Sequence, residues 1–134
     1  MKEILSPFFI ALFIFLLIDI IWISLSVKFL YKPAFGELLN EKPVLWAAIL
    51  FYIIYVFGLT LIIIKPAINY DSLTHALLMG AIFGLVAYGT YNLTNMAIIK
   101  NWSPKVVFID MAWGTFLTSI TSAATFYFTK FFLN

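Results

Sequence analysis

The stretch from Gly80 to Asn95, GAIFGLVAYGTYNLTN, decides how the rest of this chain is interpreted. Residues three or four apart share one face of an α-helix, so this stretch has a face that is small at one end and polar at the other. That face consists of Gly80, Gly84, Tyr88, Asn92 and Asn95. The stretch lies in an apolar run long enough to cross a bilayer, where lipid offers no hydrogen-bond partners. We therefore expect other helices to supply them, with Asp19 and Asp110 as the best candidates.

Composition indicates an integral membrane protein. The chain has 134 residues, of which 64% are hydrophobic, 19% aromatic and 10% charged, and its mean hydropathy is +1.06. These values lie outside the range of soluble domains. The length allows four spans of about 20 residues each and leaves no room for a separate extramembrane domain. The prediction is an all-α fold, a single four-transmembrane-helix bundle over residues 1–134, with the lipid bilayer as its first partner.

The residue types that are missing exclude several kinds of site. The chain has no cysteine, which excludes disulfides, thiolate metal ligands and a cysteine nucleophile. All eight basic residues are lysines, so there is no guanidinium group for bidentate phosphate binding, and this argues against nucleic acid as a partner. His75 has no second histidine to share a metal with. We predict no catalytic or metal-binding residue, and the sequence identifies no cofactor.

Helix start and stop signals predict helices over 4–27, 43–64, 72–99 and 104–128. Pro43 suits the first turn of the second helix, and Lys65-Pro66 is expected to end it. Asp71 and Ser72 are N-cap candidates for the third helix, and Ser103-Pro104 is the start signal of the fourth. Residues 28–42 are expected to lie along the headgroups as a connection.

Helix lengths predict that polar residues from three helices meet at one depth. At 1.5 Å per residue, Asp19, Asn92 and Asp110 lie roughly 12, 10 and 7 Å from the end of the bundle opposite the termini. The predicted ligand- or ion-binding set is Asp19, Tyr88, Asn92, Asn95 and Asp110, supported by Trp22, Tyr91 and Trp113.

The two aspartates have two interpretations each. A carboxylate at the depth of Asp19 costs about 2.5 to 3.5 kcal/mol on insertion scales. Asp19 is therefore either a proton or cation site, or an acceptor of an interhelical hydrogen bond from Asn92, a Tyr hydroxyl or a Trp N–H. Asp110 lies in the early turns of its helix, near Lys105, where the helix dipole favours an anion. It is either an ionised site or a residue that stabilises the helix start.

Other polar and aromatic residues have simpler interpretations. The pattern D-x-x-W occurs at Asp19 and at Asp110, but two matches of four letters do not establish a repeat. A polar stripe on the fourth helix either lines a path or bonds back to its own helix; it consists of Asp110, Gly114, Thr118, Ser122 and Thr125. Packing or interfacial anchoring is the interpretation for Tyr52, Tyr55, Trp46 and Trp102.

The chain resembles the domain-of-unknown-function 2177 family of small predicted membrane proteins. The resemblance rests on LIDIIW around Asp19, FYIIYVFGL from Phe51, the stretch from Gly80 to Asn95, and IDMAWGT from Ile109. It implies a four-helix membrane protein and no particular activity. The family pattern reads TYDLTN where this chain has Asn92, so the resemblance also implies one fewer carboxylate in the cluster here.

Three classes of function remain open. The leading hypothesis is an oligomeric carrier or channel for a proton, a small cation or a small hydrophobic molecule; small multidrug transporters are an architectural analogy only. The alternatives are an assembly subunit of a larger membrane complex and, less favoured, an intramembrane enzyme acting on a lipid. The lysine distribution weakly places both termini on the non-cytoplasmic side of a cell inner membrane.

Overall fold

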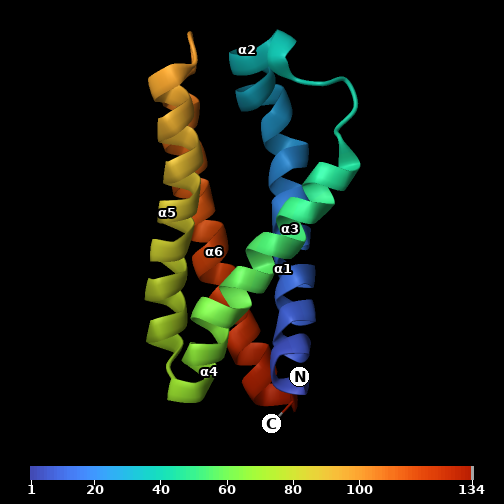
Figure 1. Ribbon diagram of the computed structural model, residues 1–134, viewed down its shortest axis with the longest axis vertical. Coiled ribbons are helices and arrows are strands. Elements are labelled where there is room, and N and C mark those ends of the chain that lie inside the picture. Colours follow the sequence, from blue (N-terminus) through green and yellow to red (C-terminus); the bar gives the residue numbers. More distant parts are fainter. Residues whose placement is uncertain (134) are drawn as a thin grey trace.

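The computed structural model describes residues 1–133, and 89% of the chain is helical with no strand over these residues. Segments long and apolar enough to cross a membrane are Lys2–Leu38, Leu45–Tyr70, Leu73–Ile98 and Pro104–Leu133. The predicted all-α four-helix membrane bundle is therefore confirmed (Figure 1).

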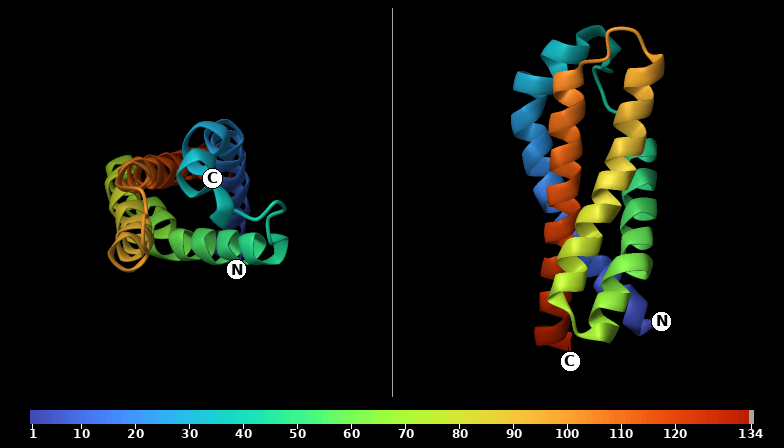
Figure 2. Two further views of the ribbon diagram at one scale, coloured as in Figure 1. Left: turned by 90° about the horizontal axis from the view of Figure 1, so that it is seen from above. Right: turned by 90° about the vertical axis from the view of Figure 1, so that its left-hand side faces the viewer.

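Three long helices stand side by side and the fourth crosses them obliquely. The upright helices are α1 (Lys2–Ser26), α5 (Leu73–Ile98) and α6 (Pro104–Leu133), whereas α3 (Leu45–Leu59) runs diagonally across the bundle (Figures 1 and 2). Both termini lie at one end, here called the terminal end. The opposite end, called the connector end, carries α2 and the loop 99–103.

The first span continues beyond its predicted end. A π-helical segment, η1 (Val27–Tyr31), is followed by α2 (Lys32–Phe35) and a 3₁₀ turn, η2 (Gly36–Leu38). The prediction that the first helix ends at residue 27 is therefore wrong, because helical structure continues to Leu38. As a consequence, Tyr31 stays on the bundle and faces the other helices.

The second span also passes its predicted stop. It starts at Leu45, so Pro43 precedes the helix, and it continues through the π-helical η3 (Thr60–Ile64) into α4 (Lys65–Tyr70). Inside an α-helix, a proline has no N–H to donate to the carbonyl oxygen four residues before it, and its ring collides with that carbonyl group. A π-helical segment precedes both Pro33 and Pro66, so each ring lies in the first turn of a new α-helix, where proline is tolerated. The prediction that Lys65-Pro66 ends the helix is wrong for this reason.

The third and fourth helices start where the sequence predicts. The Ser72 hydroxyl accepts a hydrogen bond from the backbone N–H of His75 at 3.0 Å, and the Ser103 hydroxyl accepts one from Val106 at 3.3 Å. Both serines satisfy amides that have no partner within the helix. The ranges Leu73–Ile98 and Pro104–Leu133 agree with the predicted starts, and α6 runs five residues beyond its predicted end.

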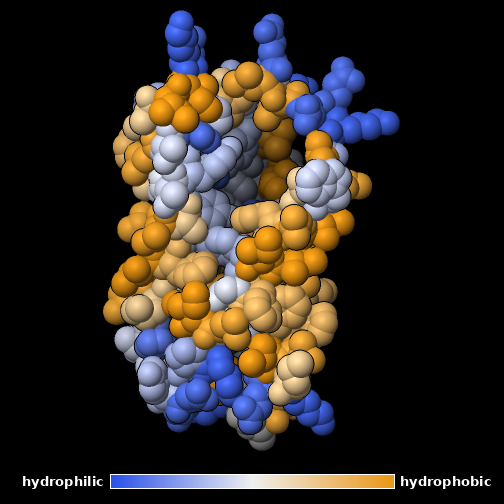
Figure 3. Space-filling view, in the orientation of Figure 1, coloured by the Kyte–Doolittle hydropathy of each residue, from blue (hydrophilic) through white to orange (hydrophobic). Residues whose placement is uncertain are grey.

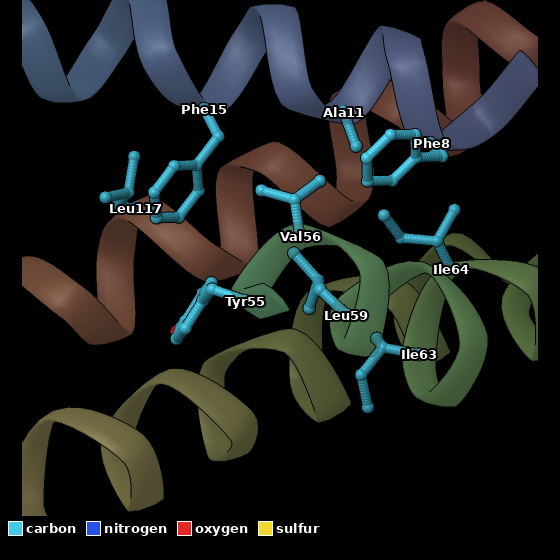
Figure 4. Packing of buried hydrophobic residues seen from close by; sticks show 9 residues of the cluster. All are labelled: Phe8, Ala11, Phe15, Tyr55, Val56, Leu59, Ile63, Ile64 and Leu117. Carbon is cyan, nitrogen blue, oxygen red and sulfur yellow. The ribbon is translucent and has the colours of Figure 1, made fainter. Parts of the chain in front are cut away.

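The apolar core joins α1, α3, η3 and α6 in the middle and terminal half of the bundle. Figure 4 shows its side chains pointing toward one another from these elements: Phe8, Ala11, Phe15, Tyr55, Val56, Leu59, Ile63, Ile64 and Leu117. Phe15, Val56, Leu59 and Leu117 have no exposed surface. The oblique α3 therefore packs closely here and leaves the connector half of the bundle less filled.

Glycines let α5 and α6 approach closely. A Cβ added at Gly80 would lie 2.8 Å from the Ser122 hydroxyl, and one added at Gly84 would overlap the carbonyl oxygen of Gly114. A Cβ at Gly114 would overlap the Tyr88 ring. This close contact fixes the register of the two helices that carry Asn92 and Asp110.

We predict opposite outcomes for two glycine-to-alanine variants. Gly84→Ala forces α5 away from the α6 backbone and should lower the free energy of unfolding by about 1 to 3 kcal/mol. Gly58→Ala is the matched control, because its Cβ would meet only Phe83 at an ordinary 3.8 Å and alanine favours a helix by up to about 1 kcal/mol. Thermal melts in detergent should show a lower melting temperature for the first variant alone. Equal melting temperatures would contradict the close α5–α6 contact.

Candidate functional site

Asp19 lies inside the bundle with both carboxylate oxygens paired. Its side chain is 7% exposed. The Tyr52 hydroxyl of α3 donates to Oδ2 at 2.7 Å, and the Trp113 Nε1–H of α6 donates to Oδ1 at 3.2 Å. A Tyr hydroxyl and a Trp N–H are two of the partner types that the sequence predicts. Asp19 thus links three spans.

Asp110 is paired in the same way by two other elements. The Tyr31 hydroxyl of η1 donates to Oδ1, and the Asn92 Nδ2 of α5 donates to Oδ2 at 2.7 Å. Asn92 is 2% exposed and also donates to the carbonyl oxygen of Tyr88 at 2.9 Å. Both protons of its amide are therefore used, which fixes the amide orientation.

The tryptophan of each D-x-x-W sequence is linked by hydrogen bonds to the aspartate of the other. Because α1 and α6 run antiparallel, Trp22 and Trp113 stack with ring centres 4.5 Å apart and an interplanar angle of 11°. Trp113 donates to Asp19 of the other sequence, and Trp22 donates to the Tyr31 hydroxyl at 3.3 Å, which in turn donates to Asp110. The tryptophan pair therefore connects the two carboxylate sites into one network.

An aromatic cavity of about 450 Å³ leads to Asp110. Its walls are Phe51 and Tyr55 of α3, Ala87, Tyr88 and Tyr91 of α5, and Asp110 itself. Figure 3 shows the hollow between α5 and α3 in the connector half of the molecule, inside a surface that is mostly hydrophobic. The cavity exists because the oblique α3 diverges from α5 toward the connector end (Figure 1).

A second cavity of about 590 Å³ approaches Asp110 from the connector end. It shares Tyr91 and Asp110 with the first, and its walls include Tyr31, Asn92 and Trp102. The Trp102 indole N–H is buried without a hydrogen-bond partner. Asp110 is therefore reached both from the side of the bundle and from its connector end.

No basic residue balances either aspartate. The ion pairs formed within residues 1–133 are Lys65–Glu3, at 3.5 Å, and Lys130–Asp71, both at the terminal end. Lys105 is exposed and does not pair with Asp110, although the sequence places it nearby. All four donors to the aspartates are neutral groups, so an ionised carboxylate in this network has no counter-charge.

The predicted site residues fall into three groups. Asp19, Asn92, Asp110, Trp22 and Trp113 come together in the network, and Tyr88 and Tyr91 line the cavity beside it. Asn95 makes no hydrogen bond to either aspartate in the described part of the chain. Within residues 1–133, no group of three His, Cys, Asp or Glu side chains is placed to hold a metal ion.

The sequence does not identify Tyr31, Tyr52 and Tyr55 as members of the site. The packing interpretation is confirmed, because Tyr55 belongs to the apolar core and Tyr52 packs against it, but their hydroxyls also bond to Thr118 Oγ1 and to Asp19, each at 2.7 Å. Tyr31 is missed because its segment is predicted to be a connection. One signal was present: a buried carboxylate needs donors, and each of these tyrosines lies on or directly after an apolar span.

Comparison with family models matches residues 4–127 to the family described as predicted membrane protein (DUF2177). No curated protein and no solved structure matches the chain.

We predict a definite order of stability for variants of the two aspartates. Asp19→Asn keeps an oxygen for Trp113, and its amide can donate to the Tyr52 oxygen. Asp110→Asn can keep its oxygen toward Asn92 only by turning its amide N–H toward the Tyr31 oxygen, which already accepts from Trp22, so that the Tyr31 proton loses its acceptor. Asp19→Ala leaves Tyr52 and Trp113 without a partner, at a cost of about 1 to 3 kcal/mol for each unsatisfied group.

Thermal melts in detergent should therefore rank the wild type and Asp19→Asn above both Asp110→Asn and Asp19→Ala. If Asp19→Asn melts as low as Asp19→Ala while Asp110→Asn is unchanged, Asp19 is an obligate buried anion and the described pairing is wrong.

Proposed function

The chain belongs to this family of predicted membrane proteins, and from that premise we propose that it is a carrier that binds an organic cation at Asp110 in exchange for a proton. The observation that carries the proposal is the pair of intramembrane carboxylates held only by neutral donors, one of them at the base of an aromatic cavity.

Charge balance supports the binding of a cation. An ionised carboxylate in the bilayer is costly, and neutral donors offset this cost without cancelling the charge. Asp19 is 7% exposed, whereas Asp110 borders both cavities. A proton or a bound cation at Asp110 supplies the missing positive charge, and the two compete for the same oxygens.

The cavity walls support an organic cation over a metal ion. Phe51, Tyr55, Tyr88 and Tyr91 supply ring faces, and a cation over such a face gains about 0.5 to 2 kcal/mol. Hard metal ions prefer six or more oxygen ligands, which this lining does not offer. A volume of about 450 Å³ is within the range of small-ligand sites in proteins.

The proposal includes an orientation and an assembly. Five of the eight lysines lie toward the connector end (Lys28, Lys32, Lys42, Lys100 and Lys105), which favours that end as cytoplasmic in a cell inner membrane and both termini as non-cytoplasmic. We propose that the carrier is a homo-oligomer. Native mass spectrometry after extraction in mild detergent should show copies of this chain alone; stoichiometric foreign subunits would instead indicate an assembly role in a larger complex.

Equilibrium dialysis with tetraphenylphosphonium, an aromatic cation, tests the binding claim. The detergent-solubilised protein should bind it, and binding should weaken as pH falls because protons compete for Asp110. Asp110→Asn should abolish binding. Asp71→Asn is the matched control, since it makes the same change in an exposed carboxylate paired with Lys130 at the terminal end. The proposal fails if Asp110→Asn binds as well as the wild type, or if the control loses binding equally.

A further inference from the structure

Three hydroxyl groups of α6 are buried without a partner. Thr121 and Thr125 have no exposed surface and Thr129 is 6% exposed, and none of their Oγ1 atoms has a hydrogen-bond partner. The other serine and threonine hydroxyls of this helix are all bonded: Thr115, Thr118, Ser119 and Ser122. Among the hydroxyls of α6, those that are buried without a partner are thus confined to the terminal half of the helix.

These threonines form a line along the helix and do not use the partner that is nearest to them. They recur every four residues, which places successive side chains on one face about 6 Å apart along the axis. Elsewhere in this chain Thr60, Thr90 and Thr115 donate to the carbonyl oxygen four residues before them, at 2.7, 2.6 and 2.8 Å. A local partner is therefore normally available to a helical threonine, and Thr121, Thr125 and Thr129 leave it unused.

The line ends in a polar pocket. Thr129 borders a cavity of about 350 Å³ at the terminal end, together with Lys2, Glu3, Ser6 and Lys65. Charged groups that lie at the membrane edge keep such a pocket hydrated. The outermost of the three threonines therefore borders a hydrated pocket.

We propose that Thr121, Thr125 and Thr129 hold a single file of water molecules that enters from this pocket. Buried polar groups without protein partners are the usual binding sites of internal water. A water molecule that bridges two hydroxyls holds their oxygens about 4.5 Å apart, since each O–H···O bond is about 2.7 to 2.8 Å long and the angle at the water is close to tetrahedral. Threonines about 6 Å apart along the axis are therefore bridged by one or two water molecules.

The water file stops at an apolar layer. Leu117, one turn before Thr121, packs with Phe15, Val56 and Leu59, and none of these side chains has exposed surface (Figure 4). Asp19 lies one turn beyond Phe15 on α1. Water thus reaches one side of this layer from the terminal end, and the carboxylate network lies on the other side. The inference does not depend on what Asp110 binds.

Cysteine labelling tests the proposal directly, because the natural chain has no cysteine. Thr125→Cys in the detergent-solubilised protein should react with a small charged methanethiosulfonate, as measured by intact mass. Val56→Cys, in the dry core, and Phe116→Cys, on the outer surface of α6, are the controls and should stay unlabelled. If Thr125→Cys stays unlabelled under conditions that modify an exposed cysteine, the water file is absent.

The melting temperature of Thr125→Val provides a second test, because a hydrated site and a dry site predict changes in opposite directions. Valine has nearly the shape of threonine and no hydroxyl. If the hydroxyl binds water, its loss leaves the neighbouring water molecules without a hydrogen-bond partner, and the melting temperature falls. If the site is dry, removal of an unpaired buried hydroxyl raises the melting temperature. Thr90→Val, whose exposed hydroxyl bonds only to its own helix, controls for the helix propensity of valine. A melting temperature at or above that of the wild type would overturn the proposal.

Discussion

Two carboxylates inside an apolar bundle impose the constraint on which the rest of the structure depends. Lipid cannot hydrogen-bond to them, so every acceptor oxygen needs a donor from another part of the chain. Asp19 draws α3 and α6 to α1, and Asp110 draws η1 and α5 to α6. The elements of all four spans are therefore tied to one network at one depth, and the tryptophan stack joins its two halves.

The sequence predicts the parts of this arrangement that are encoded locally. Apolar runs give four spans, and serine before the third and fourth spans gives their starts. The depth of Asp19, Asn92 and Asp110 follows from helix rise alone, and two of these residues prove to be directly bonded. Local patterns do not reveal the π-helical segments, because these depend on how Pro33 and Pro66 are accommodated. Tyr31 could not be placed without the first of them.

The tyrosine that donates to Asp19 could not be identified for a different reason. Tyr52 and Tyr55 lie on a helix that is apolar all round, so no periodic pattern shows which side faces the bundle. The oblique path of α3 determines which way these two side chains point, and that path depends on tertiary packing. That path also fills the terminal half of the bundle with Val56 and Leu59 and opens the connector half into cavities beside Asp110.

The central claim is that these carboxylates take up a proton or a cation and do not merely hold helices together. Liposomes that contain the purified protein and a pH-sensitive dye test it most directly, with an organic cation gradient as the driving force. We predict proton movement coupled to the cation in the wild type, and none in the double variant of Asp19→Asn and Asp110→Asn. Unchanged proton flux in a folded double variant would contradict the account.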